Sequence, residues 1–303
     1  MNKMLILENL INSEIHKDRI SSFSFLKRFL LFPDMFLHTI QCFLLRKLNI
    51  NKFVFTKTFW GRKMLVVLPE VVSSDIYRFG FIEANVARSI IKFVSKNDVV
   101  IDVGAHFGFF TILMAEIVGS KGEVHSFEPI PSTFNVLKRN ADFCQNIKIN
   151  KQAIWRNNDH LYLNDYGLNA STFNSYRDSR GVSNKVKNRL KVRAINLDEY
   201  IKKNNITPKF IKIDAESTEY EVLEGMKFIL ENIKPVICLE IGDLGVEGAR
   251  KSKNVIDYVL NYGYEAFEFN NQLFCPHKLR ENYSYGNLLL KHPKSKDMIN
   301  NIN

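Results

Sequence analysis

Cysteine is scarce in this sequence. The 303 residues include four cysteines, Cys42, Cys144, Cys238 and Cys275, which lie far apart. No two of them have the C-x-x-C spacing, and no cluster of cysteine and histidine has the spacing of zinc ligands. These absences argue against a disulfide framework and indicate reduced thiols in a cytoplasmic protein. We therefore predict no metal site.

Long hydrophobic runs are also absent. The most apolar stretch, Met35–Leu45, spans only eleven residues and contains His38 and Gln41, whereas a membrane-spanning helix needs about 20 apolar residues. Lys3 is not followed by the continuous apolar segment and small-residue cleavage site of a secretion signal. The sequence predicts a cytoplasmic protein without a membrane span.

What the sequence has in excess is positive charge. Its formal net charge is +10, and residues 177–193 alone contribute +6, with seven lysines and arginines against Asp178. This basic run can be a solvated loop, or it can face an acidic or phosphate-bearing substrate, because clustered cations concentrate anions nearby. No interleaved aromatic residues or nucleic-acid-binding motif accompany it, so we expect no nucleic-acid partner. Its basic residues are Arg177, Arg180, Lys185, Lys187, Arg189, Lys191 and Arg193.

The first fifty residues differ in pattern from the rest. Two segments that mix Phe and Leu with Lys and Arg at helical spacing are separated by Pro33. We predict a helical N-terminal extension over residues 1–51, a main domain over 52–292 and a polar tail over 293–303. The extension can cap the main domain, pack on a second subunit, or make peripheral contact with a membrane surface through residues 1–50, as basic amphipathic helices do. The sequence does not define the oligomeric state.

From residue 52 onward, short strands alternate with helices. Two strands at 53–56 and 63–68 and a helix over 83–94 come first, and most of 150–209 is expected to be irregular. Strands that alternate with helices of about 10–15 residues predict an α/β fold, with a mostly parallel sheet covered by helices on both faces. In the sheet region we predict strands at 99–103, 123–127, 147–149, 210–213, 236–240, 265–269 and 287–291, and helices at 107–118, 132–143, 217–232 and 253–261.

The first strand of this alternation ends in a glycine turn, D-V-G-A-H-F-G at 102–108. Gly104 and Gly108 let the backbone come close to a ligand, and the helix that follows offers unpaired N–H groups at its N-terminus. The spacing is G-x-x-x-G with His106 inside it, whereas a dinucleotide fold uses G-x-G-x-x-G. The turn therefore suits a small anionic group such as a carboxylate, with Asp102 orienting the turn or accepting from an ammonium. A purely structural turn is the alternative.

Carboxylates follow two other strands, and the carboxyl ends of parallel strands are where α/β sheets bind ligands. Glu128 ends the second strand, twenty residues after Gly108, where an acidic residue can accept both hydroxyls of a ribose. Asp214 follows the strand at 210–213, and its carboxylate can deprotonate a substrate hydroxyl. Glu216 can share that task or raise the pKa of its neighbour by like-charge repulsion. An acid near a helix N-terminus also stabilises the helix dipole.

Four ordered motifs extend this pattern over much of the chain: IDVGAHFGFFT (101–111), SFEP (126–129), IKIDAESTEY (211–220) and ICLEIG (237–242). The series resembles the FkbM family of S-adenosylmethionine-dependent methyltransferases, from about Phe55 to His292. The family pattern reads D-v-G-A-n-x-G and D-v-E-G-x-E, so His106 stands here for an asparagine and Ser217 for a glycine. The resemblance implies a Rossmann-like class I methyltransferase sheet that is mostly parallel and has an antiparallel last strand.

The resemblance also implies a cofactor and an activity. S-adenosylmethionine would bind at the carboxyl edge of the sheet, with Asp214 and Glu216 facing the methyl group. The implied activity is O-methylation of a hydroxyl on a glycan, glycolipid or secondary metabolite, and the basic run allows an anionic acceptor. N-methylation of an amino sugar or small amine, and a catalytically inactive cofactor-binding regulatory protein, are the alternatives. The residues implied to surround the cofactor are Glu83, Asp102, Gly104, Ala105, His106, Phe107, Gly108, Glu128 and Ala153.

Overall fold

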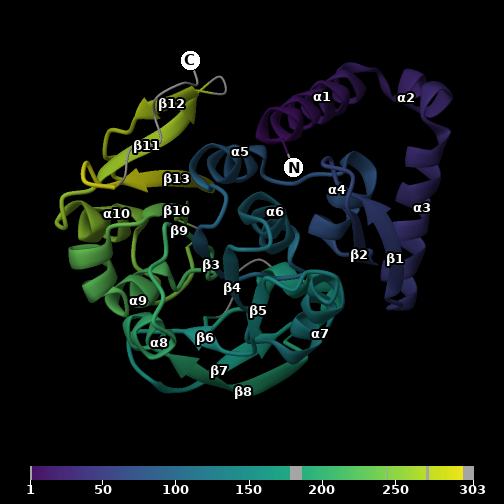
Figure 1. The fold of residues 1–303 in the computed structure, drawn as a ribbon. Coiled ribbons are helices and arrows are strands. Elements are labelled where there is room, and N and C mark those ends of the chain that lie inside the picture. Colours follow the sequence, from purple (N-terminus) through teal and green to yellow (C-terminus); the bar gives the residue numbers. More distant parts are fainter. Residues whose placement is uncertain (1, 178–185, 244, 271–272, 296–303) are drawn as a thin grey trace.

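An eight-stranded sheet forms the centre of the fold (Figure 1). The computed structural model describes residues 2–177, 186–243, 245–270 and 273–295. Across the sheet the strand order is β12-β11-β13-β10-β9-β3-β4-β5. In chain order these strands are β3 (Val99–Val103), β4 (Glu123–Phe127), β5 (Ile147–Asn150), β9 (Phe210–Ile213), β10 (Val236–Ile241), β11 (Glu265–Asn270), β12 (Leu273–Pro276) and β13 (Gly286–Lys291).

The strand order defines the type of α/β fold. The strands β5, β4, β3, β9 and β10 pair in parallel. Ranked along the chain, they read 3-2-1-4-5, which is the doubly wound Rossmann-like arrangement. β13 pairs antiparallel with β10 on one side and with β11 on the other. The prediction of a mostly parallel sheet with an antiparallel last strand is confirmed, and β12 adds an edge strand that was not predicted.

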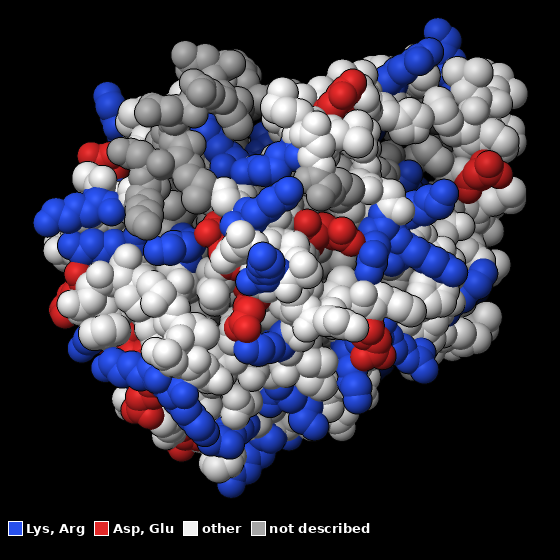
Figure 2. All heavy atoms as spheres, viewed as in Figure 1, with Lys and Arg blue, Asp and Glu red and all other residues white. Residues whose placement is uncertain are grey.

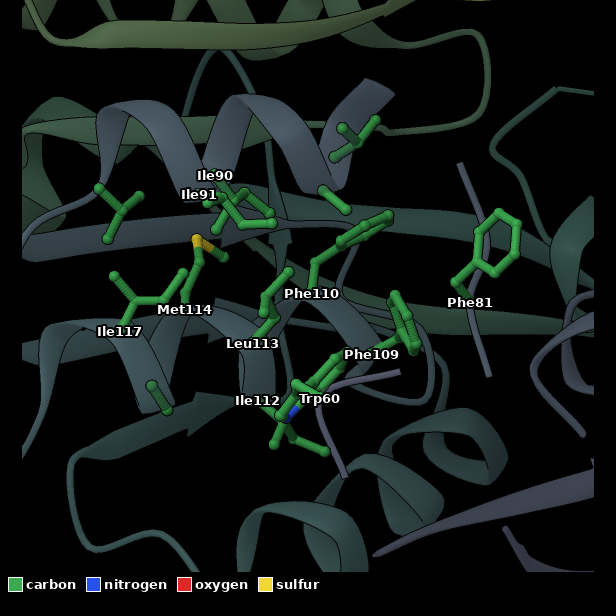
Figure 3. Packing of buried hydrophobic residues seen from close by; sticks show 14 of the residues in the cluster. Trp60, Phe81, Ile90, Ile91, Phe109, Phe110, Ile112, Leu113, Met114 and Ile117 are labelled. Carbon is green, nitrogen blue, oxygen red and sulfur yellow. The ribbon is translucent and has the colours of Figure 1, made fainter. Parts of the chain in front are cut away.

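Helices cover both faces of the sheet. Along β3, Val100 belongs to one buried apolar cluster and Ile101 to the other, because successive side chains of a strand point to opposite faces. In Figure 3, side chains of α6 such as Leu113 fill the space beside Ile90 and Ile91 of α5. The helices of this region are α4 (Val71–Phe79), α5 (Ala84–Phe93), α6 (Phe109–Val118), α7 (Pro131–Ala141), α8 (Leu197–Asn204), α9 (Glu219–Glu224) and α10 (Ser252–Leu260).

The prediction of one helix over residues 217–232 is wrong. The helix α9 ends at Gly225, and a second helical segment follows, of which Ile229–Ile233 form a π-helix. A Cβ atom on Gly225 would lie 2.3 Å from the carbonyl oxygen of Trp155, so the chain turns where it packs tightly on a neighbouring segment. The Asp198 carboxylate accepts the backbone N–H groups of residues 228 and 229, at 2.7 and 3.0 Å, and so starts the second segment.

The expectation of an irregular stretch over 150–209 is also wrong in part. β6 (Ala153–Ile154), β7 (Asp159–Asp165) and β8 (Asn188–Ile195) form a small sheet in the order β6-β8-β7, and a 3-10 helix spans Leu168–Phe173. The strand β8 takes up the second half of the basic run. Val192 and Ala194 are buried while the alternating Lys191 and Arg193 are exposed, and this period-two pattern was obscured by the charges.

The N-terminal extension is helical, as predicted. It contains α1 (Lys3–Ser22), α2 (Phe25–Leu31) and α3 (Pro33–Leu48), and the hairpin β1 (Lys52–Lys57) and β2 (Lys63–Leu68) follows.

The helix α1 caps the main domain. Ile6 and Leu10 are buried in the same apolar cluster as α5 and α6. The Lys3 ammonium donates to the carbonyl oxygens of Lys92 and Val94, at 3.2 and 2.8 Å. The domain limits at 51/52 and 292/293 stay predictions, and most of the predicted polar tail lies outside the described residues.

The helices α2 and α3 expose many apolar side chains. Within the described ranges, no helix has the length and apolar character needed to cross a bilayer. Contact with a membrane surface through residues 1–50 stays a prediction, and exposed Lys27, Arg46 and Lys47 add the positive charge that anionic lipids attract. The exposed apolar residues of these helices include Leu26, Phe29, Leu30, Leu31, Leu37, Ile40, Phe43, Leu44 and Leu48.

Vesicle co-sedimentation of the full chain tests this membrane contact. We expect the wild-type chain to pellet with vesicles that contain phosphatidylserine. A Leu37→Glu/Phe43→Glu variant should stay largely in the supernatant, because burying each of these side chains is worth about 1.5–3 kcal/mol. Phe143→Glu, which changes an equally exposed side chain on α7's C-terminal side, should behave as wild type. A wild-type chain that does not pellet contradicts the prediction.

Candidate functional site

A cavity of about 390 Å³ opens at the carboxyl ends of β3, β4, β9 and β10. The segments that follow these strands form much of its lining, as expected for a doubly wound sheet. The structure therefore brings together residues that the sequence placed after separate strands. The predicted site residues that line the cavity are Glu83, Gly104, Ala105, His106, Phe107, Glu128, Ala153, Asp214 and Glu216.

Two predicted cofactor residues, Asp102 and Gly108, are not part of the cavity lining. Both are buried and support the turn from inside the protein. Asp102 is fully buried and accepts the hydroxyl hydrogen of Thr111 at 2.5 Å. Burial raises the pKa of Asp102. Gly108 has φ +91°, and a Cβ atom there would lie 2.6 Å from a methyl group of Leu137. Asp102 thus links β3 to α6 on either side of the turn, and its role in the site stays a prediction.

Gly104 joins the two halves of the site. Its φ is +74°, and a Cβ atom on it would lie 1.7 Å from the backbone carbonyl oxygen of Asp214. Only glycine fits there, because any other side chain would collide with the end of β9. The glycine turn and the backbone that follows β9 are consequently held in direct contact.

His106 takes the place of the asparagine in the family pattern. Its φ of +49° lies in the left-handed region, where asparagine is common, so the substitution preserves the shape of the turn. The imidazole Nε2 lies 2.7 Å from the Ser171 hydroxyl oxygen. Burial lowers the pKa of His106 to about 4, which keeps the ring neutral near pH 7.

Glu128 lies at the end of β4 with its carboxyl group held by the backbone. The N–H groups of His106 and Ile130 donate to its two oxygens, at 3.1 and 3.0 Å. Burial raises the pKa of Glu128 to about 8, although these two hydrogen bonds act in the opposite direction. The side chain lines the cavity and retains acceptor capacity for a ligand hydroxyl.

Lys212 is a functional residue that sequence reasoning missed. Its ammonium is almost fully buried, 2.9 Å from the Asp214 carboxylate and 3.7 Å from that of Asp102. It also lies 3.4 Å from the carbonyl oxygen of Gly104. Burial alone would lower the pKa of Lys212, but the carboxylates outweigh this effect and raise it. The available signal was a lysine inside a strand that is otherwise apolar and buried on both faces.

Glu216 and Glu240 lie beside Asp214 in the cavity wall. Burial, and then the Asp214 carboxylate, raise the pKa of both side chains well above the ordinary value. The Asp214 charge is therefore one cause of the raised pKa of Glu216. The expected effect of Glu216 on its neighbour stays a prediction.

Tyr285 reaches the site from the C-terminal part of the chain, and no pattern in the sequence predicts this. Its hydroxyl donates to the Glu83 carboxylate at 2.7 Å. Burial raises the pKa of Glu83, and the Asp214 charge adds to that effect. Lys212 is the one lysine or arginine among the described residues that line the cavity, so this end of the cavity is acidic.

Of the basic run, the residues that the structure describes are not among those that line the cavity. The Arg177 guanidinium donates to Glu221 at 2.5 Å, and Arg180 and Lys185 lie outside the described residues. Arg189, Lys191 and Arg193 project from the exposed side of β8, which favours a solvated surface for this part. Figure 2 shows lysines and arginines interspersed with acids over the visible face.

The opposite end of the cavity is apolar. Phe127, Ile154, Trp155, Leu161 and Leu163 line it. In the parts of the chain that the structure covers, no group of three or more His, Cys, Asp or Glu side chains could hold a metal ion. A doubly wound sheet with an apolar slot, a strand-end glutamate and an acidic end defines an α/β protein with a ligand site of the nucleoside-binding type.

Comparison with known protein families identifies the family of this chain. The model of the Methyltransferase FkbM domain family matches residues 102–266, which is more than half of the chain. This chain belongs to the FkbM methyltransferase family. The match covers the glycine turn, Glu128 and the carboxylates after β9.

One curated relative is the hexuronic acid methyltransferase AglP of Haloferax volcanii, 28% identical over 162 residues. The alignment covers 51% of this chain and 61% of the relative, so the chain spans less than two thirds of that protein. A solved FkbM methyltransferase from Methylobacillus flagellatus KT is 15% identical, with a TM-score of 0.40 over 64% of this chain and 43% of that one. An rRNA methylase from Streptococcus thermophilus is 12% identical, with a TM-score of 0.41 over 70% and 97%.

Ser217, the second departure from the family pattern, also adopts a glycine-like conformation. Its φ is +71°, in the left-handed region. Its N–H group donates to Glu219 at 3.2 Å and its carbonyl oxygen accepts from Arg177 at 3.1 Å. Both contacts are made by the backbone, so the serine is held in the geometry that glycine adopts freely.

Ser217→Gly should therefore stabilise the chain. A non-glycine residue in the left-handed region costs about 1–2 kcal/mol, and the greater freedom of glycine in the unfolded chain offsets about 0.4–1 kcal/mol of that. We expect the free energy of unfolding in urea to rise by up to about 1 kcal/mol. Ser217→Ala keeps the Cβ atom and should give no gain. Equal effects of the two substitutions would show that backbone strain at this position is not the cause.

Proposed function

We propose that this chain is an S-adenosylmethionine-dependent O-methyltransferase that acts on a hydroxyl of a glycan, glycolipid or secondary metabolite. The observation that carries the proposal is the cavity itself, with Glu128 beside an apolar slot and with Asp214 and Glu216 at an acidic end. Membership of the FkbM family supports the class of reaction.

The cavity residues fit this cofactor in charge and polarity. Its sulfonium and ammonium groups are positive, and four acids, Glu83, Asp214, Glu216 and Glu240, lie around one buried lysine. The apolar slot beside Ala153 suits an adenine ring. Glu128 would accept the ribose hydroxyls, and the turn at 104–108 with Glu83 would hold the methionyl end. When bound, the cofactor supplies a methyl group already activated by its positive sulfur.

The chain's own residues would then orient the acceptor and remove its proton. Glu216 lines the cavity beside Asp214 and would accept the hydroxyl proton as the general base. Asp214 lies beside it and is oriented by the Lys212 ammonium at 2.9 Å. Aligning the reacting groups can lower the barrier substantially, because the acceptor no longer has to find its orientation in solution.

A sugar hydroxyl is the acceptor that we favour. The relative from Haloferax volcanii carries the name of a hexuronic acid methyltransferase, and the segment Ser171–Tyr176, which is rich in hydroxyl and amide side chains, lines the cavity. An amine acceptor is the second candidate, because an ammonium would also be attracted to the acidic end.

Calorimetry combined with a methyl-transfer assay tests the proposed function. We expect the wild-type chain to bind S-adenosylmethionine and to transfer labelled methyl groups to a polysaccharide and glycolipid extract. Asp214→Asn and Glu216→Gln should lower transfer by about 10²–10⁴-fold while cofactor binding persists. Glu265→Gln, on an exposed position of β11, serves as the matched control.

Each outcome of that experiment has a defined meaning. A folded chain that does not bind S-adenosylmethionine overturns the proposal. Binding without transfer to any fraction favours the catalytically inactive regulatory protein, and methylated amines as products favour the N-methyltransferase.

The pH dependence of nucleoside binding tests the role of Glu128. Its pKa is raised to about 8, so its charged form increases as the pH rises through that value. Ribose hydroxyls bind a carboxylate more strongly than a neutral acid, and the affinity should rise about tenfold between pH 7 and 9. Methylthioadenosine is the probe, because it lacks the amine that would titrate in this range. Glu128→Gln should bind weakly with no pH dependence, and a wild-type affinity that is flat with pH contradicts the assignment.

A further inference from the structure

A shallow groove of about 410 Å³ lies beside the cavity. It is bordered by α9, by the segment that follows β6 and by the loop before α10, which lie close together in Figure 1. We call it the arginine groove, after three arginines that come from separate parts of the chain. Its charged and aromatic lining consists of three arginines, two glutamates and two tyrosines: Arg156, Arg177, Arg250, Glu221, Glu224, Tyr176 and Tyr220.

Two of these arginines have acidic partners. Arg177 is mostly buried, and its guanidinium donates to Glu221 at 2.5 Å. Arg156 lies 3.5 Å from Glu224 in a pair that is partly exposed to solvent. The first pair is fixed within the protein, while the second is weak because water screens it.

Arg250 differs from both. Among the described residues, none of the ion pairs involves Arg250, and its side chain is exposed. The guanidinium lies over the Tyr220 ring, 5.0 Å from its centroid. The ring contact orients the guanidinium without neutralising it, so its N–H groups remain available to an anion.

The groove and the cavity are neighbours that share lining residues. Tyr176 lines both of them, and its ring lies 5.0 Å from that of Trp155 in the cavity wall. A small pocket between them shares Glu216 and Glu240 with the cavity and Arg250 with the groove. The three spaces are therefore neighbours, and we infer that an acceptor with its hydroxyl at Glu216 extends toward the groove.

The cavity and the arginine groove differ in the sign of their charge: acids outnumber Lys212 in the cavity, and arginines outnumber acids in the groove. An anionic group of an acceptor would be repelled by the acids of the cavity, where Lys212 is already engaged by carboxylates. We propose that the arginine groove binds an anionic group of the acceptor, a sugar carboxylate or phosphate, through Arg250 with help from Arg156. The inference rests on the proposed function, and it assigns to the groove the anion recognition that was one of two alternatives for residues 177–193.

The two tyrosines complete the site. A guanidinium recognises a carboxylate or phosphate through paired N–H donors, and the flat rings of Tyr176 and Tyr220 offer apolar faces for the C–H face of a sugar. Gly248 packs against Arg177: a Cβ atom on Gly248 would lie 3.1 Å from the Arg177 guanidinium. The groove thus selects a sugar with one negative group placed outside the reacting hydroxyl.

Ligand-observed NMR titrations of the full chain, without cofactor, test the groove. The probes are D-glucuronic acid, glucose 6-phosphate and D-glucose. We expect at least one anionic probe to bind about tenfold more tightly than glucose, because hydrogen bonds to charged groups contribute about 1.5–3 kcal/mol. The anionic probe that binds more tightly shows whether the groove recognises a carboxylate or a phosphate. Arg250→Gln should reduce the anion's affinity to that of glucose.

Arg189→Gln is the matched control. Arg189 is also an exposed arginine over a tyrosine, 5.7 Å from the Tyr162 ring, but it lies on β8 outside the groove. It should leave all three affinities unchanged. The proposal is overturned if glucose binds as well as both anions, or if Arg250→Gln and Arg189→Gln have the same effect.

Calorimetry with S-adenosylmethionine separates this proposal from the proposed function. If the chain binds the cofactor but does not prefer the anions, the proposed function stands and the anion site in the groove is rejected. A chain that prefers the anions through Arg250 but does not bind the cofactor retains the groove as an anion site, and the methyltransferase assignment fails.

Discussion

The buried ammonium of Lys212 is the interaction on which the site depends. It lies between the carboxylates of Asp102 and Asp214, which extend from the neighbouring strands β3 and β9. Removing one partner of a buried ion pair costs about 3–5 kcal/mol, because the remaining charge is left unpaired. The lysine therefore allows several acids to be buried at one edge of the sheet, and it fixes the glycine turn through its contact with the Gly104 carbonyl oxygen.

Tight backbone turns complete this arrangement. Gly104 touches the carbonyl oxygen of Asp214, and Glu216 and Ser217 both adopt positive φ angles immediately beyond it. These turns place successive carboxyl groups around one cavity instead of along a regular helix. Residues in sparsely populated conformations often occur at functional sites, where the surrounding structure holds them. The two departures from the family pattern, His106 and Ser217, both keep the backbone geometry that the turns need.

The sequence predicted the main sheet well because its central strands are short, apolar and separated by helices with clear periodicity. It failed at the small sheet, where basic residues alternate with Val192 and Ala194 in a pattern that resembles a polar loop. It failed at residues 217–232 because Gly225 and Asp198 act through tertiary contacts. For the site, strand-end acids were predictable from position. Tyr285 was not, since it contacts Glu83 across 202 residues of chain.

We propose that the cavity between Glu128 and Asp214 binds S-adenosylmethionine with its methyl group toward the acids after β9. A crystal structure of the chain with S-adenosylhomocysteine is the decisive experiment. We expect density for the adenosine beside Glu128 and Ala153, and for the sulfur near Asp214. Density for the nucleoside elsewhere on the chain, or in the reverse orientation, would contradict it.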